Sequence, residues 1–173
     1  SVILVERTAW WMHIIGIFIF LNYLYYSKHL HILLAFPNTY FANLNAKGGF
    51  ANNPTVTAEV KLMMDPDADP YAVPETTSDE PEKFGASDVM DLNRVQLLNA
   101  YTCTECGRCT SECPANQTGK LLSPRKIMMD TRDRLTEVGN NIQKNKGVFV
   151  PDGKQLYNDY ITAEELWACT SCN

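Results

Sequence analysis

Six cysteines are the residues best suited to chemistry, and all of them lie in the last 71 of the 173 residues. The first four form the pattern Cys103-x-x-Cys106-x-x-Cys109-x-x-x-Cys113, with Pro114 directly after them. In this spacing three thiolates surround one [4Fe–4S] cluster, and the fourth, followed by proline, binds a different cluster. Zinc sites usually pair two cysteine knuckles around one ion, and disulfides between thiols this close would be strained. The pattern therefore predicts iron–sulfur clusters.

A second run of the same kind begins at Cys169-x-x-Cys172, and the given sequence stops one residue later. The first residue is not Met, so we expect a segment of a longer protein. The crossing-over rule then predicts two [4Fe–4S] clusters. The first three cysteines of the first motif would hold one cluster, and Cys113, Cys169 and Cys172 the other, each completed by a further cysteine. Without that continuation Cys169 and Cys172 would be a redox Cys-x-x-Cys pair, and this alternative stays open.

Three histidines lie near the N-terminus, at positions 13, 29 and 31. His13 and His31 are 18 residues apart, which in a regular helix is five full turns, or about 27 Å along one face. Imidazole is an axial ligand of haem iron, so the spacing suits two ligands of a dihaem membrane anchor. His29 would face the opposite side. In the plainer interpretation His13 bonds a neighbouring helix or snorkels, and His31 is an interfacial residue.

A helix that carries these histidines would be long enough to cross a bilayer. Residues 8–27 contain no formal charge, and a helix of this length spans about 30 Å. Trp10 and Trp11 lie near one end and three tyrosines near the other, as in an aromatic belt. No charged region leads to a small-residue cleavage site, which argues against a signal peptide. A buried helix of a soluble protein would need a large core, and residues 37–90 do not offer one.

Residues 37–90 have the composition of a linker, with six prolines and few large apolar side chains. Such a segment buries too little surface to offset its ordering entropy, so we expect it to be extended or loop-like. Residues 59–91 carry ten acidic and two basic side chains. Their Asp-x-Asp-x-Asp spacing at 65–69 lacks the glycine and the bidentate acid of a calcium loop, which favours a solvated acidic loop. The net charge of −5 argues against nucleic acid as a partner.

Residues 91–173 have the capping signals of a compact helical domain. Asp91 is expected to cap a helix that leads to the first cysteine. Ser123-Pro124 predicts the start of a longer helix, which Gly139 is expected to end. Thr162, with a glutamate three residues later, predicts a capping box just before the second cysteine motif.

These motifs and the separation between them resemble the α-helical ferredoxin module of the iron–sulfur subunits of heterodisulfide reductase, glycolate oxidase and succinate dehydrogenase. The 55 residues between the two cysteine motifs are too many for a small bacterial ferredoxin. The resemblance to the α-helical module covers about residues 90–173. The matching segments are 103–115 (CTECGRCTSECPA), 123–130 (SPRKIMMD) and 164–172 (EELWACTSC).

The N-terminal segment resembles the last transmembrane helix of the respiratory nitrate reductase gamma family. The resemblance is carried by His13, Ser27-Lys28, His31 and Pro37. It implies that His13 and His31 are axial ligands of two b haems and that His29 is not a ligand. Relatives often have a proline where this chain has Tyr25-Tyr26, and the partner ligands would lie on an earlier helix.

The sequence thus predicts a mainly α chain with three parts. Residues 1–36 would be a transmembrane helix of a haem b module, 37–90 a Pro-rich acidic linker, and 91–173 a ferredoxin domain with two [4Fe–4S] motifs. We expect an iron–sulfur oxidoreductase component that passes electrons between membrane quinone, haem b and the clusters, with no catalytic residues of its own. Its partners would be the lipid bilayer, quinone, further transmembrane helices and redox subunits.

The predicted location is the cytoplasmic membrane, with the ferredoxin domain facing the cytoplasm, where clusters are assembled. One alternative is a non-catalytic membrane-anchored assembly or interaction subunit with structural clusters. A second alternative is a zinc-binding scaffold.

Overall fold

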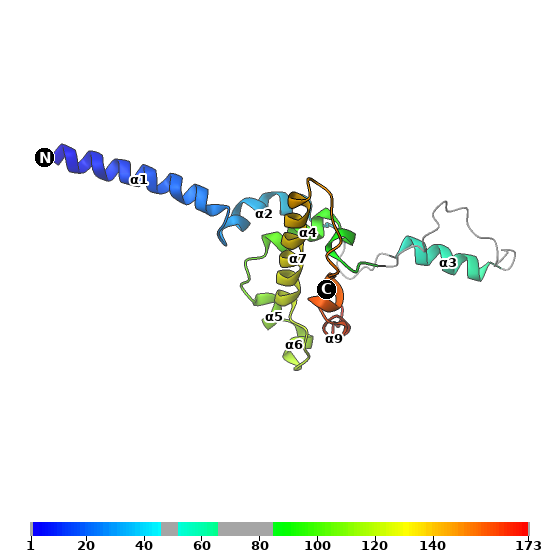
Figure 1. Ribbon diagram of the computed structural model, residues 1–173. Helices are drawn as coiled ribbons and strands as arrows, with labels where there is room; N and C mark the ends of the chain where they lie inside the picture. Colours follow the sequence, from blue (N-terminus) through cyan, green and yellow to red (C-terminus); the bar gives the residue numbers. More distant parts are fainter. Residues whose placement is uncertain (1, 46–51, 66–84, 173) are drawn as a thin grey trace.

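The computed structural model describes residues 2–45, 52–65 and 85–172 of the chain. In these ranges the secondary structure is helical, and a single isolated bridge between Tyr157 and Ile161 is the only β-type pairing. The prediction of a mainly α fold is confirmed for this part of the chain. Helix α1 and helix α3 project from opposite sides of a helical domain that is built around α7 (Figure 1).

Helix α1 (Val2–Leu24) is long and apolar enough to cross a membrane by length and composition. This confirms the predicted apolar span. The most apolar stretch of this helix is not buried against the rest of the described chain. Leu24 is the only buried residue among those described in α1. The described residues therefore provide no soluble core for this helix, as a soluble-protein interpretation would require.

The helix does not continue to His31. After Leu24 the chain makes a corner over residues 25–29, and α2 begins at Leu30 and ends at Tyr40. The Ser27 hydroxyl donates a hydrogen bond to the carbonyl oxygen of Leu24 at 3.0 Å and accepts one from the backbone N–H of His29 at 3.2 Å. Because such local bonds compete with the helical ladder, the expectation of one regular helix from His13 to His31 is wrong.

Two helices lie where the sequence predicted an extended linker. Helix α2 runs through Pro37, so its last turn occupies the beginning of that segment. Helix α3 (Pro54–Met64) forms within it, with Lys61 in the last turn, where a cation is favourable at the negative end of the helix dipole. Most of the predicted acidic loop falls on 66–84, outside the described residues.

Helix α7 (Pro124–Lys144) is the central element of the domain. Its start is the predicted one: the Ser123 side chain accepts a hydrogen bond from the backbone N–H of Lys126, and Pro124 occupies the first helical position. Its predicted end is wrong, because the helix continues through Gly139. Val138 is buried in the core and Ile142 packs against it, and this packing offsets the roughly 1 kcal/mol that a glycine costs inside a helix.

Helix α4 (Arg94–Thr102) leads to the first cysteine and packs between α2 and α7. Its N-cap is Asn93, which forms a capping box with Gln96. The sequence predicted Asp91 as this cap. Asp91 instead closes a capping box with Asp88 around the short 3₁₀ helix η1 (Val89–Asp91), two residues earlier.

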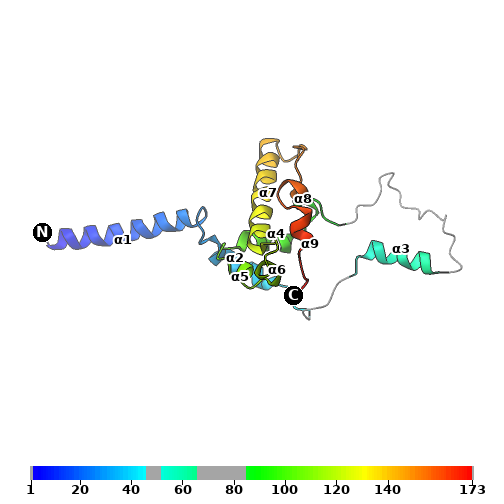
Figure 2. The ribbon, with the colours of Figure 1, turned by 90° about the horizontal axis from the view of Figure 1, so that it is seen from below.

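Two apolar clusters hold the domain together. The larger one lies between α7, η1 and the C-terminal segment, and its buried members are Val89, Val138, Leu156 and Ile161. The smaller one contains Ala115, Leu122 and Ala168. Helix α8 (Leu156–Asp159) and helix α9 (Ala163–Trp167) pass along α7 in this arrangement (Figure 2).

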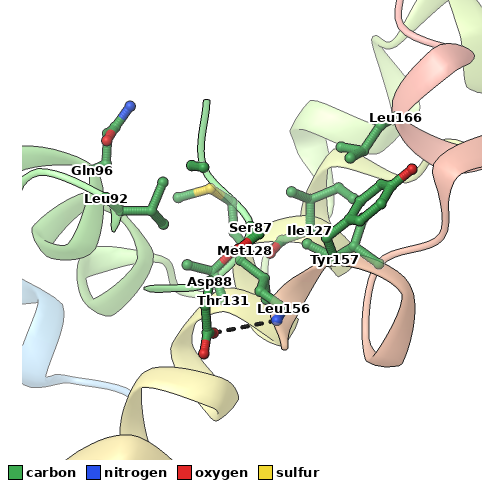
Figure 3. A pocket seen from close by; sticks show the side chains of 12 residues that line it. Ser87, Asp88, Leu92, Gln96, Ile127, Met128, Thr131, Leu156, Tyr157 and Leu166 are labelled. Atoms are coloured by element: carbon green, nitrogen blue, oxygen red, sulfur yellow. Dashed lines mark hydrogen bonds between the residues drawn. The ribbon is translucent and has the colours of Figure 1, made fainter. Parts of the chain in front are cut away.

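A buried arginine connects the same three parts. The Arg134 side chain on α7 is fully buried and pairs with Asp88 at 2.7 Å and with Asp152 at 2.6 Å. It also donates to the carbonyl oxygen of Lys154 at 2.7 Å. Asp88 accepts a further hydrogen bond from the backbone N–H of Leu156 at 3.2 Å (Figure 3). Arg134 therefore ties the segment before α4 and the segment before α9 to one point on α7.

Candidate iron–sulfur site

The first cysteine motif runs along one continuous stretch from the end of α4. Cys103 is the C-cap of α4, and Cys106 lies in the loop that follows. Cys109 is in the short helix α5 (Arg108–Ser111), and Cys113 is the N-cap of α6 (Pro114–Gln117). All six cysteines of the chain are free thiols, so none is committed to a disulfide.

The second motif follows α9, and both of its cysteines, Cys169 and Cys172, are exposed. Cys113 packs against the small cluster that contains Ala168, the residue immediately before Cys169. Cys113 and the residue before Cys169 thus belong to one group of packed apolar side chains. The assignment of Cys113 to the same [4Fe–4S] cluster as Cys169 stays a prediction.

The two motifs share an unusual backbone turn. The residue immediately before the second cysteine of each Cys-x-x-Cys has a left-handed conformation, with φ of 60° at Glu105 and 49° at Ser171. The backbone N–H of Ser171 donates to the sulfur of Cys169 at 3.4 Å. Turns of this kind direct successive N–H groups to one point, and such concavities bind anions and iron–sulfur clusters.

The environment of Cys106 favours its thiolate. The backbone N–H of Arg108 and the side chain of Thr104 hydrogen-bond to the sulfur, and together with the positive charge of Arg108 they lower the pKa of Cys106. The thiolate is the form that binds metal. Gly107, with φ of 80°, allows the chain to turn directly after this cysteine.

Two contacts hold the first motif against α7. The Arg132 guanidinium pairs with the Glu105 carboxylate at 2.6 Å, and this hydrogen bond keeps the pKa of Glu105 below its ordinary value. The hydroxyls of Thr110 and Ser123 lie 3.0 Å apart, and the backbone N–H of Arg125 donates to Thr110 at 3.2 Å. The loop that carries the first three cysteines is therefore fixed at two points.

A different cation holds the second motif. Lys126, in the first turn of α7, pairs with Glu165 of α9 at 2.9 Å and donates to the carbonyl oxygen of Tyr160 at 2.9 Å. Glu165 also closes the predicted capping box with Thr162, which is confirmed. The hydrogen bond from the backbone N–H of Thr162 lowers the pKa of Glu165, and the hydrogen bond from Lys126 lowers it further.

The donor set fits iron–sulfur clusters. It consists of thiols, and the nearby carboxylate, Glu105, is occupied by Arg132. In the described part of the chain no three His, Cys, Asp or Glu side chains converge on a point where they could hold a single metal ion. A [4Fe–4S] cluster takes thiolates on separate irons and needs no such convergence. Thiolate-bound clusters of this type carry out one-electron transfer.

The histidines are separated by the corner after α1. His13 lies on α1, while His31 lies in the first turn of α2. The Nδ1 atom of His31 is 2.7 Å from the carbonyl oxygen of Lys28. A hydrogen bond at this position fixes the tautomer and leaves Nε2 available as a ligand atom. His29 instead lies against Phe20, with ring centroids 6.1 Å apart.

His31 shares a cavity with the first cysteine motif. This cavity has a volume of about 270 Å³ and lies between the corner at 25–31 and the loop at 101–105, with Arg132 at its side. A separate groove of about 320 Å³ lies where η1, α7, α8 and α9 meet, and apolar side chains such as Leu92, Ile127 and Leu166 line it (Figure 3). That groove has no cysteine or histidine in its lining.

Sequence patterns missed the residues that position the thiols. Glu105, Lys126, Arg132 and Arg134 carry ordinary surface charges in the sequence, and their partners are up to 46 residues away. Gly107 directly after Cys106 was the available signal that the first loop turns sharply.

Comparison with known proteins points to iron–sulfur proteins and membranes. The chain is 33% identical over 193 residues to the "Probable iron-sulfur-binding oxidoreductase FadF" of Bacillus subtilis, which covers 95% of this chain and 24% of that protein. It is 25% identical over 185 residues to the "EtfAB:quinone oxidoreductase" of Syntrophomonas wolfei, covering 96% of this chain and 23% of that protein.

A third relative is the "Probable membrane-anchored ferredoxin" of Chromohalobacter salexigens, 30% identical over 105 residues, or 51% of this chain and 15% of that protein. The chain spans less than a quarter of the length of each of these relatives. No family model matches the chain. No solved structure matches it either.

Proposed function

We propose that this chain is the electron-relay segment of a membrane-bound iron–sulfur oxidoreductase. In this proposal Cys103, Cys106 and Cys109 hold one [4Fe–4S] cluster, and Cys113, Cys169 and Cys172 hold part of a second. The relay passes electrons between a membrane quinone and a catalytic domain or partner subunit. The named relatives support the iron–sulfur, oxidoreductase and membrane aspects of this proposal.

The observation that carries the proposal is the repeated turn at the two Cys-x-x-Cys motifs. In each motif a left-handed residue precedes the second cysteine, and each motif is fixed to α7 by a separate cation, Arg132 or Lys126. Preorganised N–H donors and fixed loops stabilise bound cluster thiolates and limit reorganisation when an electron arrives. The chain's own contribution is thus to hold the sulfurs and set their hydrogen bonding.

The proposal includes haem b at the N-terminal segment, with His13 and His31 as axial ligands. It is supported by the hydrogen bond from Nδ1 of His31 to the Lys28 carbonyl, which leaves Nε2 available as a ligand atom. Bound haem supplies one-electron transfer at membrane depth. The further haem ligands would come from additional transmembrane helices. His29 has no ligand role in this proposal.

We place the protein in the cytoplasmic membrane, with α1 spanning the bilayer and the ferredoxin domain on the cytoplasmic side. The span of α1 supports the membrane location. Protease accessibility of residues 85–172 in right-side-out and inverted vesicles tests the side. Cleavage in inverted vesicles alone agrees with the proposal, and cleavage in right-side-out vesicles alone contradicts it.

A visible spectrum of the full-length protein, oxidised and then reduced with dithionite, tests the cofactors. The proposal requires about eight irons and eight labile sulfides beyond haem, together with sharp b-type bands. Reduction by a short-tailed quinol then separates a relay from the alternative of an assembly subunit with structural clusters. In the latter case the clusters would stay oxidised in the presence of quinol. A colourless, zinc-loaded protein would contradict the iron–sulfur proposal itself.

A further inference from the structure

We propose that the cavity between the α1–α2 corner and the first cysteine motif binds the headgroup of a membrane quinone. This inference rests on the proposed exchange of electrons with quinone and assigns it a place in the chain. The cavity has a volume of about 270 Å³, which suits a one- or two-ring headgroup with the isoprenoid tail left outside.

The two walls of the cavity have different origins. One wall is the corner at 25–29 with the first residues of α2, which follow the candidate membrane helix. The other wall is the end of α4 with the loop at 103–105, together with Arg132. A molecule bound here therefore lies at the membrane end of α1 and also touches Cys103, a predicted cluster ligand. A lipid-soluble electron carrier needs both of these neighbours.

The walls offer what the two oxygens of a quinone ring require. Within the described part of the chain the Lys28 ammonium makes no hydrogen bond, so it is free to donate to a quinone oxygen. The Thr136 hydroxyl donates to the carbonyl oxygen of Arg132 at 2.9 Å, and the Tyr101 hydroxyl lies 2.9 Å from Thr136. Tyr101 therefore donates to Thr136, and its oxygen remains available to accept from a quinol hydroxyl.

Aromatic side chains make the cavity suitable for a flat ring. Tyr25, Tyr26 and Tyr101 line it and offer surface against which a ring can pack. The charged groups of the lining are Lys28, Arg132 and Glu105, and Arg132 is already paired with Glu105 at 2.6 Å and lies 3.6 Å from Asp133. Lys28 remains to donate to a ring oxygen, and competition with phosphatidylglycerol tests whether a lipid phosphate binds instead.

The redox step balances with the proposed cluster. A quinol bound in the cavity would give up two electrons, one at a time, to a [4Fe–4S] cluster held by Cys103, Cys106 and Cys109, with the first electron passed on along the relay before the second arrives. It would release two protons to water, and the product would be the quinone. In the opposite direction the relay would deliver two electrons in succession, and water would supply the two protons.

Photolabelling locates the site. The full-length protein, in vesicles of phosphatidylcholine, is irradiated with an azido-1,4-naphthoquinone that carries one isoprenyl unit, and the labelled peptides are sequenced. We expect label on residues 25–31 and 101–105 that the same quinone without the azide prevents. Label at the Trp10–Trp11 end of α1, or label that phosphatidylglycerol but not quinone prevents, would overturn the proposal.

Kinetics of cluster reduction by the short-tailed quinol test the contacts. Lys28→Gln is expected to raise the KM for quinol by about tenfold with little change in kcat, because it removes one charged hydrogen bond. Tyr101→Phe is expected to raise it by about threefold. Lys144→Gln, at the far end of α7, is the matched control and should change neither constant. Equal KM values in Lys28→Gln and Lys144→Gln would refute the site.

The same experiments separate this inference from the proposed function. If quinol reduces no cofactor in the unaltered protein, the quinone exchange itself fails. If quinol reduces the clusters, but the label falls outside the lining residues and Lys28→Gln leaves the KM unchanged, the proposed function stands and the quinone site lies elsewhere.

Discussion

The Cys-x-x-Cys pairs at 103–106 and 169–172 lie at the ends of different helices, α4 and α9. Both place a left-handed residue before their second cysteine, at Glu105 and at Ser171. Their supports differ: Glu105 itself is bound by the Arg132 guanidinium, whereas the backbone N–H of Ser171 donates to the sulfur of Cys169 within its own motif. The second motif is held one helix earlier, through Glu165 and Lys126.

The shape of each turn is therefore a local property, whereas its placement in the domain is not. Three neighbouring residues suffice to shape a thiolate-binding turn, but its position relative to the other motif depends on α7. That helix supplies a separate cation for each motif, Arg132 for the first and Lys126 for the second. It also supplies Arg134, which binds the segment that precedes each motif. If these three supports are independent, changing each one should affect a different part of the domain.

The largest effect is expected from Arg134→Met, which should disturb both motifs together. Removing one partner of a buried ion pair leaves uncompensated carboxylates, here Asp88 and Asp152, and costs about 3 kcal/mol. The apparent unfolding midpoint in urea, followed by the loss of cluster absorbance, measures this. Arg94→Met, at an exposed position, is the control. A loss confined to one cluster would contradict the role of Arg134 as a common support.

Single substitutions of two cysteines in the first motif should remove different clusters. Cys109→Ser is expected to remove one cluster, and Cys113→Ser the other, because Cys113 packs with the segment before Cys169. Each should lower the iron content by about four atoms, and electron paramagnetic resonance should show which signal is lost. If both variants lose the same signal, the crossing-over assignment is wrong.

The separate cations predict a smaller and selective effect. Arg132→Gln removes a positive charge beside the first motif, and Lys126→Gln does the same for the segment that leads to the second. Each should lower the midpoint potential of its own cluster by about 40 mV, the equivalent of about 1 kcal/mol for a one-electron couple. Redox titrations of both variants check this. A shift of the same cluster in both would show that the supports are coupled.

The smallest effect is expected from acid. The hydrogen bonds from Arg134 lower the pKa of Asp152 from 3.8 to about 2, so the unfolded chain binds more protons in this interval. The stabilisation is present above about pH 4 and is lost as the pH falls toward 2. Stability measured between pH 5 and pH 3 should decline less steeply in Asp152→Asn. An unchanged slope in that variant would contradict the contribution of Asp152.

The parts of the structure that follow from neighbouring residues could be predicted. Ser123-Pro124 and the Thr162–Glu165 capping box need only a few adjacent positions, and both are as expected. The apolar length of α1 is likewise a local property. The spacing of the first four cysteines predicts a ligand set, and these thiols lie along the stretch from the end of α4 to the start of α6.

The sequence-based predictions were wrong where packing between distant residues or a local side-chain hydrogen bond determines the length of a helix. Val138 and Ile142 carry α7 past Gly139, because their burial outweighs the local cost of glycine. A corner at 25–29, in which the Ser27 hydroxyl donates to the Leu24 carbonyl oxygen, separates α1 from His31. The burial of Arg134 could not be anticipated, since its carboxylate partners lie 46 residues before it and 18 residues after it.

That last separation bears on how the protein is made. As the chain leaves the ribosome, Asp88 appears first, then the four cysteines of the first motif, and then Arg134, while Asp152 and the Lys154 carbonyl are still to be synthesised. Burying the guanidinium before its last acceptors exist would leave its desolvation uncompensated. The domain therefore closes late in synthesis, after residue 154 has emerged, and the first motif stays an open loop of thiols accessible to cluster-delivery proteins until then.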